Sequence, residues 1–63
     1  MNSKEVERMF KVCLKYGGSF YSRLGEAALY ADENNKALII RTFPRIETVY
    51  GPGTNLFQNF EES

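Results

Sequence analysis

The sequence predicts an all-α fold: a small domain of three to four helices with a docked C-terminal tail. Two observations support this prediction. Apolar residues recur at helical spacing in consecutive segments, and glycine or proline follows several of those segments. A chain of 63 residues makes one domain with a marginal core. We therefore expect a single helical domain over residues 1–53 and a tail or short helix over residues 54–63.

The first helix is predicted over residues 3–16. Asn2 or Ser3 can cap its start, and Glu5 follows Asn2 by three residues, as in a capping box. Gly17-Gly18 ends it, because glycine adopts a left-handed C-cap without a steric penalty. The apolar stripe of this helix, at i, i+3, i+4, i+7 and i+8, consists of Val6, Met9, Phe10, Cys13 and Leu14.

The second helix is predicted over residues 19–31, with Ser19 as a plausible cap. Its apolar positions include three alanines, which are small enough to let a neighbouring helix approach closely. The stripe consists of Phe20, Leu24, Ala27, Ala28 and Ala31.

The third segment allows two interpretations. A β-hairpin turning at residues 32–35 would give a small α+β fold, and the β-branched content of LIIRTF favours it. A helix over residues 33–43 capped by Asp32 gives a better apolar face, because neither face of the alternative strand is cleanly apolar. D-E-N-N is also not a favoured two-residue hairpin turn. Periodicity therefore favours the helix.

Pro44 ends the third helix and starts a short helical turn over residues 45–50, which Gly51-Pro52-Gly53 ends. The tail that follows is either one helical turn capped by Thr54 or an extended arm. We expect its three large apolar residues, which are Leu56, Phe57 and Phe60, to be docked. The predicted core consists of Phe10, Leu14, Leu24, Ala28, Leu38, Ile39, Phe43 and Ile46.

Residues 17–51 resemble a pattern found in short helical proteins of phages and bacterial mobile elements. A G-G-S-F-like start leads to an alanine-rich helix ending in A-D, and an Asn-containing helix then ends in F-P. The matching residues are Gly18, Ser19, Phe20, Leu24, Ala28, Ala31, Asp32, Asn35, Leu38, Phe43, Pro44 and Tyr50. Arg45 departs from the pattern, where an acidic residue is commoner. The resemblance implies an all-helical fold and a phage or mobile-element setting, but no activity.

Charge and hydropathy restrict the setting. The net charge is zero, so the overall field does not steer the chain toward nucleic acid. Residues 1–16 carry four basic and two acidic side chains, whereas residues 44–63 carry one basic and three acidic ones. No apolar run is long enough to span a membrane, and the N-terminus lacks the pattern of a secretory signal. With one free cysteine, we expect a cytoplasmic protein, in the host cytoplasm if it is viral.

The residue types argue against an enzyme and against a bound metal or other cofactor. The chain has no histidine and a single cysteine, and its carboxylates are scattered over predicted solvent faces. Cys13 falls on the apolar stripe of the first helix, where a core residue is expected rather than a nucleophile. Asp32 and Asn35 are explained by helix capping.

Two function classes remain. The first is a non-enzymatic protein–protein interaction module that binds a protein partner or a second copy of itself, because tyrosines and apolar tail residues are typical of protein contacts. Its candidate partner-binding residues are Tyr16, Tyr21, Tyr30, Tyr50, Leu56, Phe57 and Phe60. The alternative is a small DNA- or RNA-binding regulator of helix-turn-helix type. Its candidate contacts are Asn34, Asn35, Lys36 and Arg41.

Overall fold

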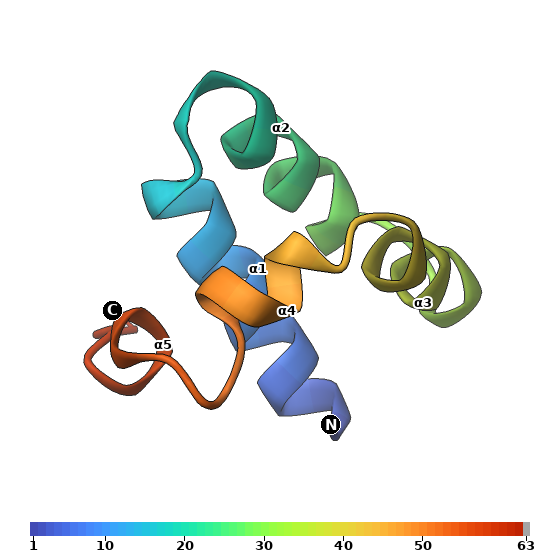
Figure 1. Cartoon of the computed structure of the whole chain (residues 1–63). Helices are drawn as coiled ribbons and strands as arrows, with labels where there is room; N and C mark the ends of the chain where they lie inside the picture. The colour runs from blue at the N-terminus through green and yellow to red at the C-terminus, as the bar shows by residue number, and fades with distance from the viewer. Residues whose placement is uncertain (63) are drawn as a thin grey trace.

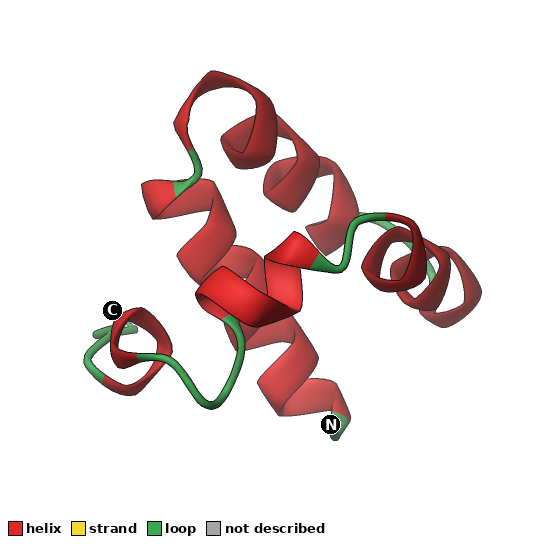
Figure 2. Cartoon of the chain, viewed as in Figure 1, coloured by secondary structure: helices red, strands yellow, loops and turns green. Residues whose placement is uncertain are grey.

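The structure is a computed structural model that describes residues 1–62, and all regular structure in that range is helical (Figure 2). The helices are α1 (Ser3–Tyr16), α2 (Gly18–Leu29), α3 (Glu33–Thr42), α4 (Arg45–Tyr50) and α5 (Asn55–Gln58). The predicted all-α class is confirmed, and the hairpin alternative is wrong. The D-E-N-N segment starts α3 because the Asp32 carboxylate accepts the backbone N–H of Asn35 at 2.8 Å. Ser63, the last residue of the predicted tail, lies outside the described residues.

Helix α1 is the element on which most of the others pack. It begins with the predicted capping box: Asn2 Oδ1 accepts the Glu5 N–H at 2.8 Å, and the Glu5 carboxylate accepts the Asn2 N–H at 3.0 Å. Helices α2, α4 and α5 all contact α1, whereas α3 packs against α2. Figure 1 shows the consequence: α4 crosses in front of α1, with α3 and α5 on opposite sides.

The second helix starts differently from the prediction. Gly17 rather than Ser19 is its N-cap, and α2 ends at Leu29 rather than at residue 31. Gly18 has φ +71°, a left-handed conformation that lets the chain reverse between α1 and α2. The close approach to α1 occurs at Gly25 rather than along the alanines. A Cβ atom on Gly25 would lie 2.8 Å from two α1 backbone atoms, the Leu14 nitrogen and the Phe10 oxygen.

The core is centred on α1. Its members are Met9, Phe10, Val12, Cys13, Ala28 and Ile46, all fully buried, with Tyr50 and Phe57 nearly so. Phe10, Ala28 and Ile46 were predicted. Val12 lies outside the predicted stripe of α1, because α4 and α5 cover a second side of this helix that the pattern of one stripe does not indicate.

The remaining predicted core residues lie at its edge or outside it. Half-buried positions are Leu14, Leu24, Ile39 and Phe43. Leu38 is 47% exposed, so its assignment to the core was wrong. No α3 residue is fully buried. Because each residue turns a helix by about 100°, Leu38 faces away from the side that Ile39 and Phe43 turn toward α2.

The tail forms the helical turn capped by Thr54: its hydroxyl accepts the Phe57 N–H at 3.2 Å. Arg8 of α1 fixes this turn. Its guanidinium donates to the Phe57 carbonyl at 2.8 and 3.0 Å and to the Phe60 carbonyl at 2.7 Å. The same group lies 5.0 Å from the centre of the Phe57 ring. The tail is therefore docked as predicted, through Phe57 and the half-buried Phe60, and a long-range contact to α1 holds it. Leu56, which was expected to dock as well, is exposed.

Candidate protein-binding surface on helix α2

The structure separates the predicted partner-binding residues into three groups. Tyr16, Tyr30 and Leu56 are exposed, Tyr30 by 88%, whereas Tyr21 and Phe60 are half-buried. Tyr50 and Phe57 are only 7% exposed, so they belong to the core and are unavailable to a partner. They are buried because α4 and α5 both pack on α1. In keeping with this, burial raises the pKa of the Tyr50 phenol.

One exposed aromatic residue was missing from the predicted set. Phe20, on the first turn of α2, is 57% exposed although the sequence placed it on an apolar stripe. Its ring packs edge-on against Tyr21 at 5.1 Å and against Phe43 at 5.7 Å between centroids. These contacts support one side of the ring and leave the other side open. Phe20 is thus an aromatic side chain that Tyr21 and Phe43 hold in place while it faces solvent.

Phe20 belongs to a continuous stripe on the outer side of α2. We define the α2 stripe as Phe20, Arg23, Ala27 and Tyr30, all of which are exposed. Their spacing of three, four and three residues is that of the contact positions in a coiled coil. At about 100° per residue they fall within an arc of about 80°. This spacing can be read from the sequence, but the adjacent apolar stripe of Leu24, Ala28 and Ala31 made it hard to recognise.

Helix α2 is held firmly behind this stripe. The Ser22 hydroxyl donates to the Leu14 carbonyl at 2.6 Å, and the Cys13 thiol donates to the Tyr21 carbonyl at 3.1 Å. Together with the close backbone contact at Gly25, these bonds fix α2 on α1. Phe20, Arg23 and Ala27 are therefore displayed on a rigid helix rather than on a loop. Tyr30 follows as the C-cap residue of α2, and its backbone N–H donates to the Ala27 and Ala28 carbonyls.

The predicted nucleic-acid contacts lie on α3. Asn34, Asn35 and Arg41 are exposed, but Lys36 is half-buried. Lys36 lines an open groove of about 390 Å³ between α3 and the start of α1. Two acidic residues, Asp32 and Glu33, precede these side chains, so the start of α3 carries both signs of charge. The structure brings the four candidates onto one helix but not onto a basic surface.

The basic residues of α1 bind the chain's own acidic tail. Lys11 Nζ lies 3.1 Å from a Glu62 carboxylate oxygen and 3.7 Å from Glu7, and Arg8 lies 3.4 Å from Glu62. The hydrogen bond with Glu62 raises the pKa of Lys11, and the same bond lowers the pKa of Glu62. Arg8 and Lys11 are thus partly neutralised, which reduces the basic character that the sequence indicated for this helix.

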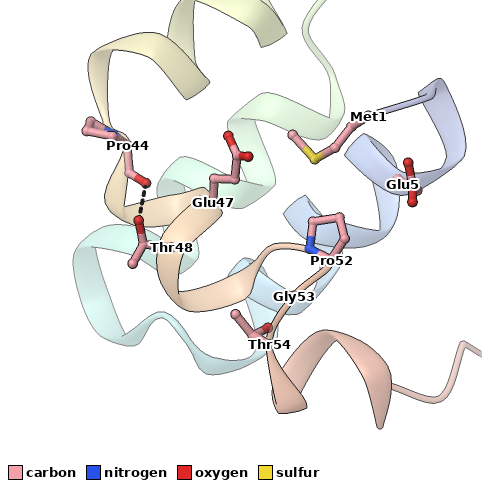
Figure 3. A pocket seen from close by; sticks show the side chains of 8 residues that line it. All are labelled: Met1, Glu5, Pro44, Glu47, Thr48, Pro52, Gly53 and Thr54. Atoms are coloured by element: carbon pink, nitrogen blue, oxygen red, sulfur yellow. Dashed lines mark hydrogen bonds between the residues drawn. The ribbon is translucent and has the colours of Figure 1, made fainter.

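A hollow of about 620 Å³ lies between the start of α1, α4 and the 52–54 loop (Figure 3). Three of its lining polar side chains bond to the chain's own backbone. The Glu5 carboxylate closes the α1 capping box, the Thr48 hydroxyl donates to the Pro44 carbonyl at 3.2 Å, and the Thr54 hydroxyl donates to the Gly51 carbonyl at 2.8 Å. The hollow is thus built largely from helix ends, and three of its polar side chains are engaged in capping and turn bonds.

Two further features bear on chemistry. Burial raises the pKa of the Cys13 thiol to about 11, so this thiol is protonated at neutral pH. Among the described residues, no group of three or more His, Cys, Asp or Glu side chains is placed to hold a metal ion. Within residues 1–62, no helix has the length and apolar character needed to cross a membrane.

No protein-family model, curated protein or solved structure matches this chain. The resemblance of residues 17–51 to phage and mobile-element proteins therefore stays a prediction.

Proposed function

We propose that this chain is a non-enzymatic protein–protein interaction module that binds through the α2 stripe. The observation behind the proposal is the exposure of two aromatic side chains on that stripe: 57% for Phe20 and 88% for Tyr30. Aromatic residues and arginine are enriched at the centres of protein interfaces, and alanine scans find them among the residues that dominate affinity. The stripe combines two aromatic residues with Arg23.

Preorganisation supports the same proposal. Binding is stronger when the contact residues are already held in place, because less conformational entropy is lost on association. The Phe20 ring rests against Phe43, and α2 is bonded to α1 through Ser22 and Cys13. A partner would meet a fixed helical face.

The biological setting is a separate part of the proposal. From the resemblance of residues 17–51, we propose an accessory protein of a phage or mobile element that acts on a host or viral protein. Its free cysteine fits a reducing compartment such as the cytoplasm.

Site-specific photo-crosslinking in cells tests the proposal. A photoreactive phenylalanine analogue replaces Phe20, and a matched control carries it at Asn55, an exposed residue of α5. We expect the analogue at position 20 to capture one defined protein, which is either another protein or a second copy of this chain. The purified form of that protein should bind saturably. Tyr30→Glu should weaken that binding at least tenfold. Equal labelling from both positions, or no saturable binding by the purified protein, would overturn the proposal.

One observation favours the nucleic-acid alternative. Only Tyr30, Ala31 and Asp32 separate α2 from α3, a spacing found in helix-turn-helix proteins. Heparin chromatography and DNA titration at several salt concentrations discriminate the two functions. A DNA-binding protein would lose affinity steeply with salt, and Arg41→Ala would reduce the slope. The interaction-module proposal predicts no retention on heparin at physiological salt.

A further inference from the structure

We propose that the partner on the α2 stripe is a second copy of this chain, packed antiparallel about a twofold axis. The inference rests on the proposed function and names its partner. A twofold contact uses the same patch on both copies, so the patch must be complementary to itself. The α2 stripe, together with the neighbouring exposed Glu26, has that property in both shape and charge.

The shape complementarity follows from residue spacing. Let the axis pass beside α2 midway between Arg23 and Glu26. Phe20 of each copy then lies within about one residue rise, 1.5 Å, of the level of Tyr30 of the second copy. Ala27, the small member of the stripe, lies near the axis and allows the two helices to approach closely. Phe20 of each copy therefore packs near Tyr30 of the second copy, once at each end of the contact.

The charges select the same arrangement. Arg23 and Glu26 are both exposed and lie three residues apart on α2. An antiparallel pair places Arg23 of each copy against Glu26 of the second copy, which forms two ion pairs by symmetry. A parallel pair in register would instead place like charges together, and juxtaposed like charges disfavour a complex. The zero net charge of the chain adds no long-range repulsion between copies.

The small size of the patch limits the affinity. A typical stable interface buries about 800 Å² per partner, which is a large share of the 4292 Å² accessible surface of this chain. Helix α2 has 12 residues and is therefore about 18 Å long. Its outer stripe covers less than a typical interface. We therefore expect a weak dimer, with a Kd between about 10 μM and 1 mM.

Sedimentation equilibrium on the full chain from about 10 μM to 1 mM, the range set by that expected affinity, tests the inference. Arg23→Glu and Glu26→Arg should each raise the Kd at least fivefold, because each places like charges across the axis. Their equimolar mixture should restore association as a heterodimer, in which every pair is again of opposite sign. Lys4→Glu is the matched control, since it reverses an exposed charge on α1. Circular dichroism of each variant checks that it remains folded.

Three results would overturn the inference: a monomeric wild type up to 1 mM, single variants that associate like the wild type, or a mixture that stays as weak as its components. The outcomes for the two proposals are distinguishable. If the wild type is monomeric and the Phe20 crosslinker captures a different protein that binds saturably, the interaction function stands and the second-copy inference fails. If neither association occurs, both fail.

Discussion

Replacing Arg8 by alanine tests how the tail is held. The Arg8 guanidinium makes three hydrogen bonds to two carbonyl groups at the end of α5 and lies over the Phe57 ring. A one-turn helix has no stability of its own, so the turn depends on contacts with the rest of the chain. Arg8→Ala removes these contacts and leaves the two carbonyl groups without their donor.

The magnitude follows from the geometry. A hydrogen bond that involves a charged group contributes about 1.5–3 kcal/mol. Since the Arg8 side chain is 26% exposed, solvent weakens its bonds, and we take about 2 kcal/mol for all three together. The contact with the ring adds about 0.5 kcal/mol at a partly exposed site. We expect a loss of about 2–3 kcal/mol, which lowers the Tm by roughly 10–20 °C in a domain of this size.

Thermal and urea unfolding followed by circular dichroism measure this loss. Arg8→Lys keeps the charge and the helix propensity, but a compact ammonium group lacks the planar fork of donors with which the guanidinium reaches both carbonyl groups, so about half of the loss should remain. Lys4→Ala, at an exposed site of the same helix, should change stability by less than about 0.5 kcal/mol. An Arg8→Ala variant that is as stable as Lys4→Ala would refute the reasoning.

Three other changes test separate contacts. Gly25→Ala places a Cβ atom 2.8 Å from two α1 backbone atoms. It should lower the free energy of unfolding in urea by about 1–3 kcal/mol, despite the better helix propensity of alanine. Unchanged stability would contradict the close contact between α1 and α2. The buried Cys13 thiol, with a pKa of about 11, should react with a thiol reagent at pH 8 only as fast as the chain opens; immediate stoichiometric labelling of the native chain would disagree with that burial. The pKa of Glu62 is lowered by its hydrogen bond with Lys11, so its contribution to tail docking is present above the usual carboxyl pKa and is lost as the pH falls through the lowered value. Amide exchange in α5, corrected for its intrinsic pH dependence, should therefore show less protection at acid pH, and Glu62→Gln should remove this change; the same pH dependence in that variant would exclude Glu62 as its cause.

Local features of this fold were predictable because they depend on residues three or four positions apart. The Asn2–Glu5 capping box and the Asp32 and Thr54 caps all form as expected. Each uses a side chain that reaches a backbone N–H within its own first turn. Periodicity favoured the helix over the hairpin without excluding the hairpin, and in the structure Asp32 caps α3 by accepting the Asn35 N–H.

Features that depend on how helices meet were not predictable. Arg8 and Phe57 are 49 positions apart, and no local pattern indicates their contact. The excess of basic residues in 1–16 and of acidic residues in 44–63 agrees with such a contact, since Lys11 pairs with Glu62. The burial of Tyr50 and Phe57 likewise depends on where α4 and α5 pack.

The candidate surface was predictable only in part. Tyr30 was identified because tyrosine is common in interfaces, and it is exposed. Phe20 was assigned to a buried stripe, because two apolar stripes run side by side on α2 and periodicity alone does not say which one faces the core. The contact at Gly25, which fixes the orientation of α2 on α1, decides between them.

The central claim is that the α2 stripe binds a second copy of this chain. A dilution series followed by two-dimensional ¹H–¹⁵N NMR tests it most directly, because it reports every backbone amide at once. We predict concentration-dependent shifts centred on Phe20, Arg23, Ala27 and Tyr30, with α5 unchanged. Shifts centred on α5 or on the 390 Å³ groove beside α3 would contradict the claim, as would spectra that do not change with concentration.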